Sequence, residues 1–201
     1  MTEKDRKYLR NHFTEHAFSP DIREAGPFDG TNRKLGCFIG VTESLKLKQS
    51  DVLRRTPFPD RTIVAKIEGS GIAFTAVCFH SLTGVGYKKT KSAQYTGIAE
   101  YLAAHKDEPM ICCFDANEPE VDHYNLENVK FFNQRGDRGT GAALLMGADP
   151  VHNMQDTYRV FLKKNPTVLH EIQQQQDQTT DEKALKYLPL TTSHILRGPI
   201  S

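Results

Sequence analysis

The 201-residue sequence predicts a protein of the α/β class, on three observations. Two apolar runs of strand length, 62–67 and 72–79, flank a turn with the sequence Gly-Ser-Gly, which is typical of an antiparallel hairpin. A stretch of helical periodicity follows at 88–105. A further apolar run of strand length follows this helix, at 109–114. Strands and a long helix therefore share one chain.

The other elements are expected in the following order. Residues 3–17 permit a short amphipathic helix, 19–34 are loop, and 35–41 form a buried strand. The stretch 46–60 is polar and contains two prolines, so no element is expected there. Helices are expected at 139–146 and 154–163, and 173–183 is expected to be a mobile surface loop.

Apolar patterning identifies the buried faces. The run 72–79 is apolar on both faces, as expected of a central strand. The helix at 88–105 places Tyr95, Ile98, Ala99 and Leu102 on one face. We expect all 201 residues to form a single domain, with a thin core because hydrophobic residues make up only 38% of the chain.

Composition limits the function classes. The 26 basic and 25 acidic side chains nearly cancel, so any binding of nucleic acid must be local rather than driven by overall charge. The four cysteines lack the spacing of a zinc site, and we expect buried, reduced thiols. No apolar stretch approaches the roughly 20 residues of a membrane helix, which predicts no membrane partner and a cytoplasmic location.

Polar residues end the two apolar strands. His80 follows one strand, and Asp115 and Asn117 follow the other. If the strands are neighbours, these side chains meet at one rim of the sheet. An Asp can orient a water or bind a hard cation, and an Asn amide can donate to a phosphoryl oxygen.

Structural alternatives apply to each residue. A His at a strand end is more often a hydrogen-bonded structural residue, and Asp-x-Asn is a common turn composition. The order of features favours a functional interpretation: strand, His80, loop, a helix with Lys91 and Gln94, a second strand, then Asp115-Ala-Asn-Glu-Pro119.

In this order, residues 35–159 resemble the endonuclease/exonuclease/phosphatase superfamily, which includes deoxyribonuclease I, exonuclease III and sphingomyelinases. Phe79-His-Ser81, Lys91 to Gln94 and Phe114-Asp-Ala-Asn117 occupy the places of the family motifs. Asp122-His123 and the expected helix start Asp156-Thr-Tyr-Arg159 match a bacterial branch. The resemblance implies a DNase I-like four-layer α/β sandwich, here without its first and last strands.

The resemblance also implies residue roles. Asp115 would position the attacking water, Asn117 would bind phosphate or a metal, and His80 would stabilise charge on the phosphoryl oxygens. Ser81, Lys91 and Gln94 would lie at the substrate. Mg²⁺ or Mn²⁺ would be held by Asp115 and Asn117. Nucleic acid or another phosphodiester would be the substrate.

The sequence departs from the family at both ends. The strand with the principal glutamate ligand of the metal is not found, and residues 1–34 and 165–201 match poorly. The closing Ser-Asp-His motif has only Thr192-Ser-His194 as a local counterpart. We therefore expect an incomplete domain, whose sheet a partner chain could complete.

Three further features have structural alternatives. Gly136 to Gly141 superficially suggests a phosphate loop but lacks the Gly-Lys-Ser/Thr ending. Lys88, Lys89 and Lys91 could contact phosphates or form a solvated helix face. Asp122 and His123 could join a metal site or form a surface turn.

Three hypotheses remain open from the sequence. The first is a metal-dependent phosphodiesterase or nuclease. The second is a catalytically impaired remnant or binding module of the same fold. The third is an unrelated α/β binding protein, in which His80 and Asp115 would lie far apart.

Overall fold

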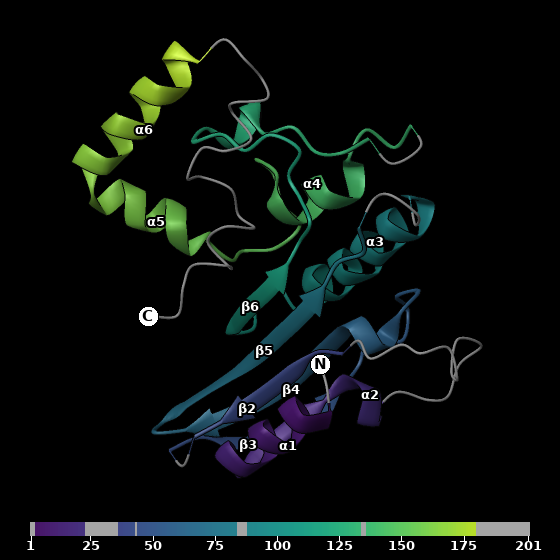
Figure 1. Ribbon diagram of the computed structural model, residues 1–201. Helices are drawn as coiled ribbons and strands as arrows, with labels where there is room; N and C mark the ends of the chain where they lie inside the picture. The colour runs from purple at the N-terminus through teal and green to yellow at the C-terminus, as the bar shows by residue number, and fades with distance from the viewer. Residues whose placement is uncertain (1–2, 23–35, 43, 84–87, 134–135, 180–201) are drawn as a thin grey trace. The chain divides into compact units, whose positions relative to one another are not determined.

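A computed structural model describes residues 3–22, 36–42, 44–83, 88–133 and 136–179 (Figure 1). These residues combine strands and helices, so the predicted α/β class is confirmed. They fall into two compact units, the first within 1–81 and 107–114 and the second within 82–106 and 115–201. Most of the expected loop at 19–34, the stretch 180–183 and the Thr192–His194 motif lie outside the described residues.

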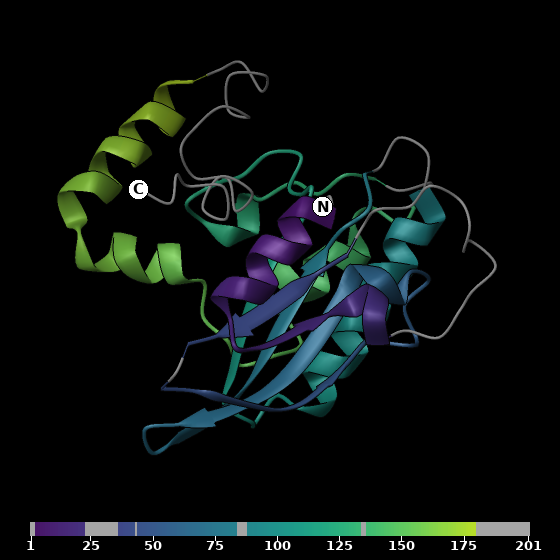
Figure 2. The same cartoon turned by 60° about the horizontal axis from the view of Figure 1, so that its bottom comes forward.

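The first unit contains two sheets. One pairs β1 (Glu15–Phe18) with β2 (Phe38–Val41) in antiparallel fashion. The other has the order β3-β4-β5-β6, with β3 at Lys46–Asp51, β4 at Thr62–Gly69, β5 at Ile72–His80 and β6 at Met110–Asp115. Helix α1 (Glu3–His12) lies beside β1 and β2 in both views (Figure 1, Figure 2). The short helix α2 (Ser19–Ile22) and a 3-10 turn (Pro59–Arg61) complete this unit.

The predicted hairpin is confirmed. Strands β4 and β5 pair from Thr62 opposite Phe79 to Gly69 opposite Ile72. The two residues between them, Ser70 and Gly71, both have positive φ, at 52° and 79°. Such a two-residue turn matches the natural twist of the strands, which fixes the register of the hairpin.

The core of the first unit lies between its two sheets. Ile63, Ala65 and Ile67 alternate along β4 and are almost fully buried. They pack against Ala17 of β1 and Val41 of β2. Because side chains alternate across a strand, one face of the larger sheet covers the smaller one.

Strands β5 and β6 run parallel. The Thr75 N–H donates to the Pro109 carbonyl at 2.9 Å. Further along both strands, the rings of Phe79 and Phe114 stack with centroids 4.4 Å apart and planes 7° apart. The contact partner of Thr75 is Pro109 and that of Phe79 is Phe114, so both strands run in the same direction. Strand β5 is central, between β4 and β6, as its sequence predicts.

The second unit is mainly helical. It contains α3 (Lys88–Ala104), a 3-10 turn (Leu126–Asn128), α4 (Thr140–Met146), α5 (Thr157–Lys164) and α6 (Pro166–Gln178). The predicted apolar face of α3 is confirmed, because all four of its residues are buried. Gly141 lets α4 approach this helix closely: an added Cβ would lie 3.1 Å from Ser92 O and from Tyr95 Cβ.

Four elements differ from the sequence prediction. Strand β3 forms in a stretch expected to have no element, and β1 forms partly where a helix was expected. The four residues of α2 are helical within the expected loop. Residues 173–178 belong to α6 rather than to a mobile loop, because Ile172 and Gln176 are buried and anchor this helix.

No helix among the described residues has the length and apolar character needed to cross a membrane. All four cysteines are free thiols. Cys37 is buried, whereas Cys113 is exposed, so burial holds for some of the thiols and not for all.

Candidate active site

One face of α3 carries three buried polar groups that bind neighbouring loops. Lys91, Gln94 and Tyr95 follow the i, i+3, i+4 spacing that puts side chains on one helix face. They are 1%, 0% and 2% exposed, respectively. Buried polar atoms are stable only with hydrogen-bond partners, and each of these side chains has one.

Lys91 holds the loop that follows β6. Its Nζ lies 2.6 Å from Glu118 Oε1 and donates to the Asn117 carbonyl at 2.8 Å. Glu118 is 2% exposed, so the ion pair is buried. Glu118 Oε2 also accepts the Phe132 N–H at 3.0 Å. One carboxylate thus joins α3 to two loop segments.

Burial raises the pKa of Glu118 above its usual value, although the Lys91 ammonium acts in the opposite direction. The desolvation of a carboxylate disfavours its charged form, and the adjacent cation offsets part of that cost. The charged form of Glu118 thus depends on Lys91, because removal of Lys91 would leave Glu118 buried without a counterion.

Gln94 and Tyr95 bind two different loops. Gln94 Oε1 accepts the Leu82 N–H at 3.0 Å, and Leu82 belongs to the segment that follows β5. The Tyr95 hydroxyl donates to the Ala116 carbonyl, in the segment that follows β6. Adjacent residues of one helix thus hold the continuations of both strands.

Asp115 and Asn117 form a compact turn. Asp115 Oδ1 accepts the Asn117 N–H at 3.2 Å. Asn117 has a φ of 49°, the left-handed region that Asn enters more readily than most residues. The positive φ of this turn therefore favours Asn at position 117, independently of any role in chemistry. Asp115 and Asn117 are both half-buried.

His80 ends β5 in the first unit and is half-buried. Arg61 donates to the carbonyls of His80 and Ser81, at 3.5 and 3.2 Å, which fixes the end of the strand. Ser81 is fully buried. Ser81, Lys91 and Gln94, expected at the substrate, are therefore all enclosed, and the last two bind protein groups.

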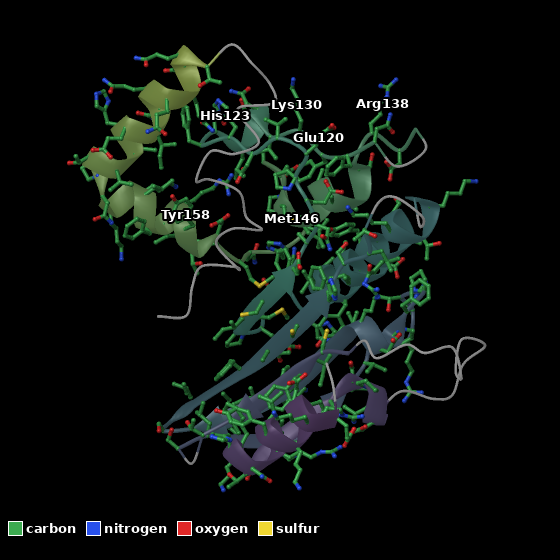
Figure 3. The ribbon with its side chains drawn as sticks, viewed as in Figure 1. Glu120, His123, Lys130, Arg138, Met146 and Tyr158 are labelled. Atoms are coloured by element: carbon green, nitrogen blue, oxygen red, sulfur yellow. The ribbon has the colours of Figure 1, made fainter. Side chains whose placement is uncertain are left out.

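A second buried charged cluster surrounds Asp122. Asp122 Oδ1 lies 2.8 Å from Arg159 Nη2 and is enclosed, with 1% of the side chain exposed. Arg159 also pairs with Asp156, whose carboxylate caps the start of α5. The matched helix start is thus confirmed at Thr157. Figure 3 labels two sequence neighbours of this cluster, His123 and Tyr158.

Asp122 is buried, and it belongs to no metal-type cluster of side chains in the part of the chain that the structure describes. Burial raises its pKa to about 6, with Arg159 opposing the shift. Gln176 of α6 donates to the Asp122 carbonyl at 3.4 Å and accepts the Tyr124 N–H at 3.1 Å. Asp122 therefore secures α5 and α6 to the preceding loop, which corrects the surface-turn alternative.

The turn at Asp115 and Asn117 carries oxygen atoms of the kind that bind magnesium. Among the described residues, no three His, Cys, Asp or Glu side chains gather as a metal site. Magnesium is commonly held by one or two carboxylates, with waters and substrate phosphates as its other ligands. The Asp115 carboxylate and the Asn117 amide share one turn and fit such a partial set. Glu118 is committed to Lys91 and does not extend it.

Sequence reasoning missed two residues near this turn. In the sequence Glu118 is only part of Asp115-Ala-Asn-Glu-Pro119, and no local pattern pairs it with Lys91. Phe132 belongs to no motif. Its position became evident only through the pairing of Val121 with Lys130, which brings the two loop segments together (Figure 3, labels Glu120 and Lys130).

No known protein family matches the sequence, and no curated protein does. Several solved structures are similar. The human Nocturnin catalytic domain with bound sulfate has 20% identity and a TM-score of 0.44, over 61% of this chain and 49% of that one. ANGEL2, a 2',3'-cyclic phosphatase in complex with adenosine-2',3'-vanadate, has 14% identity and a TM-score of 0.44, over 75% and 49%.

A humanized D. rerio TDP2 has 14% identity and a TM-score of 0.42, over 59% of this chain and 50% of that one. This chain thus spans about half the length of the structures it matches. All three TM-scores lie below 0.5.

Proposed function

We propose that this protein hydrolyses phosphate esters, with His80, Asp115 and Asn117 in one active site. The observation that carries the proposal is that two adjacent side chains of α3 bind the segments that follow β5 and β6. Gln94 binds Leu82, two residues after His80, and Tyr95 binds Ala116, one residue after Asp115. Residues that closely follow His80 and Asp115 in the chain are thus held by one face of α3, which supports the proposal.

The parallel pair of strands adds support. Phe79 and Phe114 stack, and His80 and Asp115 are the next residues along their strands. Polar groups at the carboxyl ends of neighbouring parallel strands are a common location for active sites in α/β proteins.

The proposed residues divide the chemistry between them. Asp115 accepts a hydrogen bond from the attacking water and directs its lone pair at phosphorus. The water oxygen forms a bond to phosphorus as the bond to the leaving oxygen breaks; the water gives its proton to Asp115, and the leaving oxygen takes a proton from solvent. The Asn117 amide and His80 donate to the phosphoryl oxygens, where negative charge increases. A magnesium ion, held by Asp115 and Asn117, would supply further charge neutralisation.

The experiment is hydrolysis of plasmid DNA and of a generic phosphodiester by the purified chain, with magnesium or manganese and with a chelator. We expect activity that the chelator and Asp115→Asn both abolish. Asn117→Gly is the sharper variant, because Gly accepts the positive φ and removes only the amide. A folded Asn117→Gly variant with full activity would contradict the role of Asn117.

A second candidate function is phosphate binding without hydrolysis. The observation that favours it is the commitment of Glu118 to Lys91, which leaves Asp115 as the carboxylate of the turn. In that case the folded chain would bind inorganic phosphate and release no product, with either metal present. Turnover above the chelated control excludes this candidate.

A further inference from the structure

Phe132 is an exposed aromatic residue in the loop attached to the Asn117 turn. It is 38% exposed, one of five large apolar side chains with such exposure in the described part of the chain. The others are Tyr8, Ile72, Ile111 and Phe161. Phe132 differs from them because its backbone and its ring are both tied to groups next to the proposed active site.

The backbone of Phe132 is held at a defined place. Its N–H donates to Glu118 Oε2 at 3.0 Å. Two residues earlier, Lys130 exchanges backbone hydrogen bonds with Val121, at 2.9 and 3.0 Å. A side chain on a backbone fixed in this way needs little further ordering when a ligand binds, which favours affinity.

The ring of Phe132 shares one ammonium group with Asn117. Lys91 Nζ lies over the ring, 5.4 Å from its centroid, and binds the Asn117 carbonyl at 2.8 Å. Lys91 is only 1% exposed, so the part of Phe132 that meets solvent lies away from Lys91. An apolar aromatic surface is thus open to solvent beside the residue proposed to bind phosphate.

We infer that Phe132 is a stacking platform for a base attached to the bound phosphate, so that the substrates are nucleotides or nucleic acid rather than phospholipids or phosphoproteins. The inference depends on the proposed phosphate site at Asn117. Stacking of bases on aromatic side chains tolerates any base, because each base has a π face. It therefore gives the site a preference for nucleotides without sequence specificity.

The absence of tryptophan from the whole sequence allows a direct test. Phe132→Trp introduces a single indole, whose fluorescence is followed during titration with adenosine monophosphate, with and without magnesium. Ribose 5-phosphate, which has the same phosphate and no base, is the matched ligand. Phe161→Trp is the matched protein control, since Phe161 is 46% exposed on α5 in the same unit.

We expect adenosine monophosphate, but not ribose 5-phosphate, to quench the indole fluorescence of the Phe132→Trp variant in a saturable way. The fluorescence of the Phe161→Trp variant should not change with either ligand. Phe132→Ala should weaken adenosine monophosphate binding about fivefold to 150-fold and leave ribose 5-phosphate binding unchanged. No quenching, equal quenching in both variants, or unchanged affinity in Phe132→Ala would overturn the inference. Quenching without any hydrolysis would instead count against the proposed function.

Discussion

Lys91 Nζ lies 2.6 Å from Glu118 Oε1, and both side chains are 1% exposed. Removal of one partner from a buried pair leaves an unpaired charge, which typically costs about 3–5 kcal/mol. Lys91→Met should therefore lower the free energy of unfolding by roughly that amount, measured by urea denaturation. Lys91→Met with Glu118→Gln should lower it by less, because no buried charge remains.

The control for this prediction is Lys48→Met. Lys48 and Glu68 also pair, at 3.2 Å, but their side chains are 54% and 50% exposed. Exposed pairs contribute about 0–1 kcal/mol, so this variant should be close to wild type. Equal losses for Lys91→Met and Lys48→Met would contradict the importance assigned to the buried pair.

Gly139 has a φ of 74°, and an added Cβ would collide with Phe131 Cβ. Gly139→Ala should destabilise the protein by more than the ~1–2 kcal/mol cost of the left-handed backbone, because the Phe131 loop must also move. Gly136→Ala is the matched variant: its φ is 86°, and no atom lies within 4 Å of an added Cβ. Thermal unfolding of the two variants should place Gly139→Ala clearly lower.

The pKa of Asp122 is raised to about 6, mainly by burial. A carboxyl group whose pKa is higher in the folded state binds its proton more tightly there. Its contribution to stability is present at pH 4 and is lost as the pH rises through 6. Asp122→Asn stays neutral, so its stability relative to wild type should improve by roughly 2 kcal/mol between pH 4 and pH 7.

Urea denaturation of wild type and Asp122→Asn across this pH range measures the effect. If the attraction of Arg159 outweighed burial, the opposite trend would appear and Asp122→Asn would become relatively less stable at higher pH. That result would refute the raised pKa of Asp122.

The elements that the sequence predicts are those in which apolar residues mark the buried face. The hairpin of β4 and β5 was predictable from its apolar runs and Gly-containing turn, and α3 from its buried face. Strand β3 was not, because Lys46, Lys48 and Gln49 face solvent on an edge strand and carry no apolar signal. Helix α6 was not predictable over 173–178, because this part is polar and Gln176 gives no apolar signal although it is buried. The partners of Gln176 lie more than fifty positions earlier.

The candidate site shows the same division. His80, Asp115 and Asn117 could be selected from the ends of two apolar strands. The sequence could not reveal that Lys91 is buried on Glu118, because a lysine near a phosphate motif suggests substrate contact. The pairing of Val121 with Lys130 sets the place of Phe132, and it leaves no pattern in the sequence.

The measurement that most directly tests the central claim is a double-mutant cycle on kcat/KM for a nucleotide phosphodiester, with His80→Gln, Asp115→Asn and the combined variant, each checked for folding by circular dichroism. Residues that act as a unit at one phosphate give losses that do not multiply. We predict that each single variant loses about a hundredfold or more, and that the combined variant loses little beyond the worse single one. Losses that multiply as for independent sites, or wild-type activity in either single variant, would contradict a shared active site.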